Sequence, residues 1–199
     1  MELKALLEKR FAAKSFDGKK IDEAKITQLK ELIRLTPSSF NIQPWKIKVV
    51  TDQKIKDQLM AASWGQPKVG NCSHVFVFCA DTNVIGKIDE LIAMLVKNGA
   101  PKASLKGYED MMKGALSPRS PEALREWAQK QVYIALETGL LGATSLGFDS
   151  CPMEGFDPAA YSKILKLPAN ILPTVVMPVG YTTEKATPKV RFATKDVFF

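Results

Sequence analysis

Two pairs of basic residues, one near each end of this 199-residue chain, have the spacing to do chemistry together. Arg10 and Lys14 are four positions apart, which a helical turn would align and an irregular loop could also make converge. Lys189 and Arg191 are two positions apart, so an extended strand puts both on one face. If the fold joins the two ends, these cations form a pocket suited to a phosphate. The alternative is ordinary solvated charge, because 28 residues are Lys or Arg.

A polar segment at 37–45 follows a predicted helix and precedes a predicted strand. Ser38 and Ser39 supply hydroxyls, and Asn41 and Gln43 supply carboxamides, which together suit a polyol or a heterocycle. Pro44 favours an extended conformation for Gln43. The alternative is common turn chemistry, since Ser and Asn are frequent in turns.

Two further turns carry groups that could bind a ligand. Residues 64–68 are predicted to form a turn that combines an aromatic ring, an amide and a cation. Residues 152–156 follow a predicted strand, at the kind of position where open α/β sheets bind ligands. The Glu154-Gly155 pair there would offer backbone amides, unless it is a plain strand-to-helix turn.

Several catalytic motifs are missing from the sequence. There is no GxGxxG, GxSxG or HExxH pattern, and the glycine spacing at 142–147 continues without the Lys-Ser/Thr of a P-loop. The single histidine, His74, begins an apolar strand and is interpreted as structural. One histidine argues against a His-dependent triad and against a multi-histidine metal site, so we expect no metal.

Composition narrows the class of protein. Hydrophobic residues make up 46% and charged residues 25%, as in soluble globular proteins. The net charge of +7 favours anionic ligands, but the basic residues are too dispersed for a nucleic-acid interface. The longest apolar run, 75–80, is too short to cross a bilayer, and the first ten residues lack a signal peptide. Three cysteines without CxxC spacing suit a reducing compartment. We expect one domain over 1–199, in the cytoplasm, with no membrane or nucleic-acid partner.

Periodicity predicts an alternation of helices and strands. Helices are expected near 1–9, 22–35, 53–62, 84–97, 103–115, 121–146 and 158–165, and strands near 45–50, 74–80, 148–151 and 171–179, with further strand-like stretches after Tyr181. Ser120 is the predicted N-cap of the longest helix, with Pro121 at its first position. That helix becomes apolar all round towards its end, where small residues such as Gly139 and Gly142 permit another helix to approach closely. This pattern favours a homodimer seam over the central helix of a monomeric core.

In order along the chain, these segments resemble the nitroreductase family of FMN-dependent oxidoreductases. The resemblance rests on KRFAAKSFD (9–17), PSSFNIQPW (37–45), SHVFVFCA (73–80), EWAQKQVY (126–133), MEGFD (153–157) and PKVR (188–191), and it spans nearly the whole chain. It implies an α+β fold with a central mixed, mainly antiparallel sheet flanked by helices. It also implies an intertwined homodimer with a long interface helix, an exchanged C-terminal arm and FMN at the subunit interface.

The resemblance implies a role for each candidate residue. Arg10, Lys189 and Arg191 would hold the FMN phosphate, and Lys14 would lie near the pyrimidine edge of the flavin, with Lys68 nearby. From the other subunit, Ser38, Ser39 and Asn41 would line the ribityl chain and the ring. A backbone amide at Glu154 and Gly155 would lie near flavin N5. The other residues expected at the cofactor are Phe11, Ala12, Gln66, Gln131 and Met153, and Phe40 and Trp64 are expected at the substrate.

Three departures from the family pattern bear on this site. Phe11 and Ala12 replace polar residues of relatives, so only backbone contacts remain at Ala12. Gly65 stands where relatives often carry an asparagine, and Gln66 is expected to compensate. Residues 83–120, which would roof the substrate, are shorter.

The implied activity is reduction of nitroaromatics, quinones or other flat acceptors by NADH or NADPH, through ping-pong hydride transfer. The alternatives are a flavin, dihydropteridine or enone reductase, a dehalogenase-like enzyme, or a flavin-binding carrier or sensor without turnover.

Overall fold

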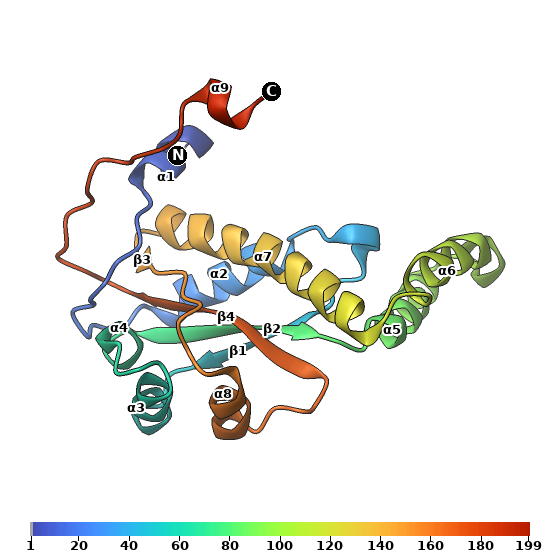
Figure 1. Cartoon of the computed structure of the whole chain (residues 1–199), viewed down its shortest axis with the longest axis horizontal. Helices are drawn as coiled ribbons and strands as arrows, with labels where there is room; N and C mark the ends of the chain where they lie inside the picture. The colour runs from blue at the N-terminus through green and yellow to red at the C-terminus, as the bar shows by residue number, and fades with distance from the viewer. Residues whose placement is uncertain (1) are drawn as a thin grey trace.

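The structure is a computed structural model that describes residues 2–199, and its helices and strands are shown in Figure 1. The helices are α1 (Leu3–Lys9), α2 (Glu23–Arg34), the 3-10 turn η1 (Ser39–Asn41), α3 (Gln53–Ala61), α4 (Pro67–Gly70), α5 (Val84–Lys97), α6 (Lys102–Leu116), α7 (Pro121–Ser145), α8 (Pro158–Leu165) and α9 (Thr194–Val197). The strands are β1 (Trp45–Val50), β2 (His74–Asp81), β3 (Asp149–Ser150) and β4 (Ile171–Gly180). The predicted α+β class is confirmed.

Within residues 2–199 the strands form a four-stranded sheet in the order β1-β2-β4-β3. Each neighbouring pair is antiparallel, with Trp45 opposite Ala80 and His74 opposite Val179. An isolated parallel bridge joins Ala12 to Ser150 beside β3. The sheet is therefore mainly antiparallel, and its parallel component comes from the N-terminal segment.

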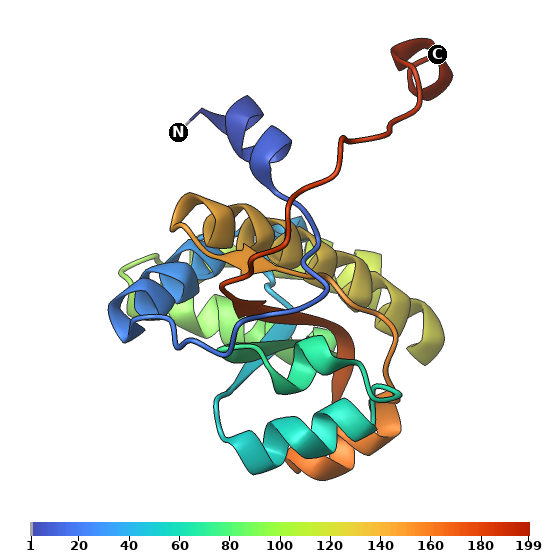
Figure 2. The same ribbon diagram turned by 90° about the vertical axis from the view of Figure 1, so that its left-hand side faces the viewer.

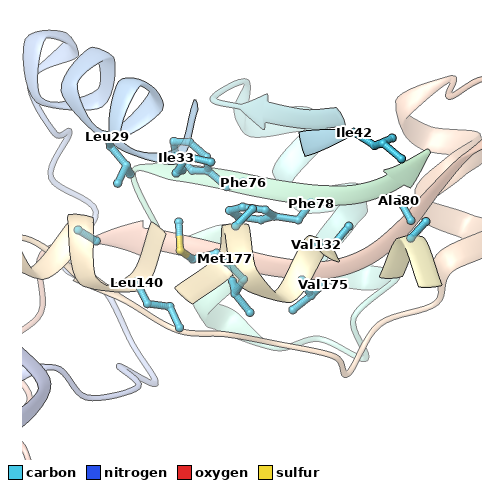
Figure 3. Close-up of a cluster of buried hydrophobic side chains, with 14 of the residues drawn as sticks. Leu29, Ile33, Ile42, Phe76, Phe78, Ala80, Val132, Leu140, Val175 and Met177 are labelled. Atoms are coloured by element: carbon cyan, nitrogen blue, oxygen red, sulfur yellow. The ribbon is translucent and has the colours of Figure 1, made fainter. Parts of the chain in front are cut away.

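The central strand β2 is buried along its whole length, as its continuous apolar run predicts. Phe76 and Phe78 pack with α2, α5 and α7 on one face of the sheet (Figure 3), whereas Val75 and Val77 pack with α3, α4 and α8 on the other. Figure 2 shows the resulting layers edge-on, with α3 and α8 on the opposite side of the sheet from α7. The sheet thus separates two hydrophobic cores, one on each of its faces.

The long helix α7 begins where predicted, because the Ser120 hydroxyl accepts a hydrogen bond from the Ala123 amide at 3.2 Å. The small residues of α7 pack in the hydrophobic core of the same chain. A Cβ on Gly139 would lie 3.3 Å from the Phe78 ring, and a Cβ on Gly142 would lie only 2.9 Å from Leu29 of α2. The close approach predicted for another helix is therefore made within the subunit. The outward face still carries exposed apolar side chains, including Tyr133 and Ile134.

The buried polar groups support the structural interpretation of His74. Its Nδ1 lies 2.8 Å from the Ser73 hydroxyl and its Nε2 lies 3.0 Å from a Glu23 carboxylate oxygen. Burial lowers the pKa of His74, against the opposing effect of Glu23. Cys72 and Cys79 are buried free thiols, and burial raises their pKa values to about 11 and about 12.

The C-terminal arm, residues 181–199, differs from the prediction. Within the described chain it forms no strand, but runs extended from the sheet to the short helix α9. Figures 1 and 2 show the arm rising away from the sheet on the side where α1 projects. Its apolar side chains at Val190, Phe192 and Phe198 are exposed, because the arm meets no free sheet edge of its own subunit. No helix in residues 2–199 combines the length and apolar character needed to span a membrane.

Candidate cofactor-binding site

The two ends of the chain meet in a cationic cluster formed by Arg10, Lys189 and Arg191. Arg10 caps the C-terminus of α1, and its carbonyl oxygen accepts a hydrogen bond from the Lys189 ammonium on the arm. Partial desolvation and repulsion from Arg10 and Arg191 lower the pKa of Lys189. The structure therefore brings together cations that the sequence places 179 positions apart.

The Arg10 guanidinium in this cluster has a buried donor that suits an anion. Its Nη1 atom is buried and, among the described residues, has no hydrogen-bond partner. A buried charged donor without an acceptor is costly, and buried polar groups in proteins are almost always paired. The guanidinium fork matches the oxygens of a phosphate. The residues present therefore fit a phosphate group.

Lys14 is exposed, four residues after Arg10, and its own amide is fixed to the arm. That amide donates to Glu184 Oε2 at 2.8 Å, and the Ser15 hydroxyl donates to Glu184 Oε1 at 2.8 Å. These two hydrogen bonds lower the pKa of Glu184, with a further contribution from the Lys14 charge. Sequence analysis did not identify Glu184, because an isolated carboxylate in a tail carries no local signal.

The N-terminal segment lies against β3 and the segment that follows it. The Ala13 amide donates to the Ser150 carbonyl at 3.2 Å, next to the bridge between Ala12 and Ser150. Met153 is buried and pairs with Val176, with both backbone hydrogen bonds at 2.9 Å. Phe11 is half-buried against the same core. Phe11, Ala12 and Met153 thus belong to the backbone segments that lie against β3 and β4.

The Glu154-Gly155 turn is held from two sides. Gln66 Nε2 donates to the Gly155 carbonyl at 2.7 Å, and the Tyr133 hydroxyl donates to Glu154 Oε1 at 2.5 Å. The Trp64 ring covers the turn so closely that a Cβ on Gly155 would lie 3.3 Å from its Cζ3 atom. Within the described residues, the Glu154 and Gly155 amides donate no hydrogen bond, so both are available to a ligand.

The turn predicted over residues 64–68 is shorter in the structure. It ends at Gly65, and α4 begins at Pro67, where a proline suits the first helical position. Gln66 Nε2 donates to the Ser63 and Gly155 carbonyls, so this side chain supports the Glu154-Gly155 turn. Lys68 is half-buried in α4.

Trp64 combines high exposure with an unusual backbone. Its side chain is 72% exposed and its φ is 55°, in the left-handed region that most residues avoid. Strain of this kind concentrates at functional sites. The backbone therefore holds a large ring in the open beside Gly155.

A second polar group forms around η1. The Ser39 amide donates to Gln131 Oε1 at 2.9 Å, which fixes the loop to the middle of α7, and the Tyr108 hydroxyl donates to the Phe40 carbonyl at 2.8 Å. The Ser38 hydroxyl accepts from the Gln43 amide at 2.8 Å. These contacts bring together the residues predicted in this segment, including buried Gln131.

The η1 loop is strained, and the extended conformation predicted for Gln43 is wrong. Phe40, Asn41 and Gln43 have φ values of 55°, 54° and 50°. The bond from Ser38 and a tight turn, in which the Trp45 amide donates to the Gln43 carbonyl at 2.8 Å, override the preference imposed by Pro44. Contacts within the loop thus hold three of the four positions from 40 to 43 in the left-handed region.

The two groups of candidate residues lie apart within one chain. Figure 1 shows α1 and the arm at the upper left, whereas the light-blue turn that contains η1 lies to the right, towards α5 and α6. One subunit therefore does not bring Ser38, Ser39 and Asn41 to the cationic cluster.

Comparison with known proteins identifies the family of this chain. The model of the nitroreductase family matches residues 7–181. A Staphylococcus saprophyticus protein named as a candidate NAD(P)H nitroreductase is 33% identical over 200 residues, which cover 94% of this chain and 91% of that protein. A Staphylococcus haemolyticus protein with the same description is 31% identical, over 94% of this chain and 92% of its own.

Solved structures share the fold. The crystal structure of a Bacillus subtilis protein described as a candidate nitroreductase has a TM-score of 0.90 and 25% identity, covering 97% of this chain and 95% of its own. A nitroreductase-like protein from Exiguobacterium sibiricum, solved in complex with FMN, has a TM-score of 0.90 at 21% identity, over 99% of this chain and 96% of its own. With the family model matched over most of its length, this chain belongs to the nitroreductase family.

Proposed function

We propose that this protein is an FMN-dependent oxidoreductase that takes electrons from NADH or NADPH and reduces nitroaromatics, quinones or other flat acceptors. The observation that carries the proposal is the cationic cluster, in which buried Arg10 Nη1 has no acceptor among residues 2–199 and lies in the same cluster as Lys189 and Arg191. The name given to the Staphylococcus relatives and the FMN in the Exiguobacterium structure support it.

Each half of the site has a distinct task in this proposal. Arg10, Lys189 and Arg191 bind the phosphate, and Lys14, with Lys68 nearby, stabilises negative charge on the pyrimidine edge of the reduced ring. The Glu154-Gly155 turn presents free amides to the ring edge that contains N5. FMN supplies the hydride chemistry, so the chain needs no nucleophile or acid–base pair of its own.

Trp64 and Phe40 are proposed to bind the substrate. The exposed Trp64 ring beside Gly155 offers an aromatic face to a flat acceptor or to nicotinamide. Stacking of this kind is tolerant of substituents, which suits a set of flat acceptors better than one polar substrate.

We further propose that the site is completed in a homodimer. Ser38, Ser39 and Asn41 would come from the partner subunit, because the η1 turn lies apart from α1 and the arm in its own chain. Gln131 would come with them, because it accepts a hydrogen bond from the Ser39 amide. The exposed Tyr133 and Ile134 on α7 and the exposed apolar arm are the surfaces that such a dimer would cover. All of 1–199 would then act as one cofactor-binding domain.

Purified protein tests the proposal directly. The protein should retain FMN, bleach anaerobically with NADH or NADPH, and recover its flavin absorbance when a nitroaromatic or a quinone is added. Retained flavin that neither nicotinamide reduces would instead indicate a carrier or sensor. A protein that binds no added FMN would exclude both functions.

A further inference from the structure

The arm carries Glu184, whose carboxylate accepts two hydrogen bonds from the N-terminal segment. Glu184 lies between β4 and the basic pair of the arm, and it is half-buried. Its two carboxylate oxygens accept separate hydrogen bonds, from the Lys14 amide and from the Ser15 hydroxyl, both at 2.8 Å. The Glu184 amide in turn donates to the Thr182 hydroxyl at 3.1 Å, which fixes the turn that presents the carboxylate.

Two other hydrogen bonds join the arm to the N-terminal segment, one on each side of the Glu184 contacts. Nearer the sheet, the Asp17 amide donates to the Tyr181 carbonyl at 2.9 Å. Nearer the arm's end, the Lys189 ammonium donates to the Arg10 carbonyl. Beyond Tyr181, Glu184 and Lys189 make the hydrogen bonds that join the arm to the N-terminal segment within residues 2–199.

The cationic cluster needs such a connection because its members repel one another. Arg10 and Arg191 both act against the charge of Lys189. Before an anion arrives, this repulsion favours an arm that swings away from Arg10. Glu184 lies five residues before Lys189, and its two charge-assisted hydrogen bonds hold the arm against this repulsion.

We propose that Glu184 is a positioning residue for cofactor binding, which ties the arm that carries Lys189 and Arg191 to the segment that carries Arg10 and Lys14. The proposal rests on the proposed function in one respect, namely that the cluster receives the FMN phosphate. Preorganising the cluster should raise affinity by removing the cost of ordering the arm at the moment of binding.

The test compares E184Q with D196N in the full-length protein. Both substitutions remove one carboxylate from the same arm, but Asp196 lies in α9, beyond the basic pair. A glutamine lacks the negative charge that strengthens both hydrogen bonds, and its Nε2 group can meet the Ser15 hydroxyl only as a donor. We expect E184Q to weaken FMN binding by about tenfold, since a hydrogen bond to a charged group contributes about 1.5 kcal/mol. D196N should bind FMN like the unmodified protein.

Comparing FMN with riboflavin, which lacks the phosphate, distinguishes an effect on the phosphate-binding cluster from a general loss of structure. If Glu184 acts through the phosphate cluster, E184Q should lower the affinity for FMN much more than the affinity for riboflavin. An equal loss for both flavins, or no loss for FMN, would overturn the proposal. S15A provides a milder variant that removes one hydrogen bond from an exposed hydroxyl, and it should change the FMN-to-riboflavin ratio in the same direction.

Hydrogen exchange in flavin-free protein gives a readout that does not depend on flavin binding. The Lys14 amide, which donates to Glu184, should exchange faster in E184Q than in D196N. Unchanged exchange would refute the connection itself. If the unmodified protein binds no FMN, the proposed function fails, while the exchange result still decides whether Glu184 holds the arm.

Discussion

Tyr133 on α7 donates a 2.5 Å hydrogen bond to Glu154 Oε1 in the turn that follows β3. The bond links the middle of the longest helix to a turn whose amides are available to a ligand. Burial and the neighbouring Glu154 carboxylate raise the pKa of Tyr133 to about 12, so the phenol remains a neutral donor at physiological pH. Gln66 holds the carbonyl of the next residue, Gly155, from the opposite side.

Removing this bond should slow flavin reduction more than it destabilises the fold. Tyr133→Phe loses a partly exposed hydrogen bond, which contributes about 1 kcal/mol. We expect reduction of the bound flavin by NAD(P)H to slow by roughly fivefold, on the basis of that free energy. Anaerobic stopped-flow measurement checks this. E154Q should have a similar effect, and the double variant should be little worse than either single one, whereas strict additivity would show that the two groups act separately.

Arg10 and Arg191 should matter mainly for cofactor retention. Arg10→Ala removes the buried Nη1 donor, which has no acceptor in the described part of the chain. FMN should therefore bind between ten- and a hundredfold more weakly, as expected for a lost charge-assisted hydrogen bond. Arg191→Ala should act in the same direction. Fluorescence titration with FMN measures both affinities. Lys195→Ala, in α9 of the same arm, is the matched control. An equal loss of FMN affinity in that variant would show that the overall charge of the protein causes the effect.

Lys14 should influence the redox potential as well as affinity. Without its positive charge, the anionic reduced flavin is less stabilised, so Lys14→Ala should make the potential more negative. A shift on the order of 30 mV corresponds to 1.4 kcal/mol for a two-electron couple. Equilibration with a reference dye measures the potential. Lys19→Ala removes a nearby exposed lysine paired with Asp17, and its potential should stay at the unmodified value.

His74 should make stability depend on pH. Burial lowers its pKa below 6.5 in the folded state, while Glu23 opposes this change, and Lys20 and Lys30 reinforce it. The unfolded chain therefore binds a proton near pH 6.5 that the folded chain still excludes. Stability is complete above that pH and is lost as the pH falls from 6.5 towards the folded pKa, by at most about 1.4 kcal/mol per pH unit.

Urea unfolding between pH 5 and 8 measures this slope. His74→Gln should be less stable at pH 8, because a buried hydrogen-bonded side chain is replaced, but its stability should vary less across the window. A slope equal to that of the unmodified protein would assign the pH dependence to other groups.

Gly180 should tolerate no side chain. A Cβ there would lie 2.7 Å from Cδ1 of the buried Phe16 ring, so Gly180→Ala should destabilise the fold by about 1–3 kcal/mol through overpacking. Gly107→Ala in α6 meets open space and should be neutral or stabilising, because alanine is the better helix former. Thermal unfolding of the two variants distinguishes steric crowding from the general effect of adding a methyl group.

Local sequence patterns were sufficient to predict these helices and strands. The continuous apolar run of β2, the alternation in β1 and the Ser120-Pro121 start of α7 each predict a structure that depends on near neighbours, and each is confirmed. The ordered motifs also indicated the family and the candidate residues, because their spacing along the chain is itself the signal.

Long-range contacts decided the rest. The glycines of α7 pack on β2 and α2 of their own chain. Gln43 is a local exception, because it is left-handed despite Pro44 where its amide donates to the Ser38 hydroxyl five positions earlier. Glu184 emerged only when the folded chain placed it beside Lys14 and Ser15, about 170 positions away. The sequence by itself determined which groups could bind a phosphate. Only the tertiary structure decided that Arg10 and Lys189 meet, because hydrogen bonds that Tyr181 and Glu184 accept from the N-terminal segment hold the arm beside Arg10 against the repulsion of the cations.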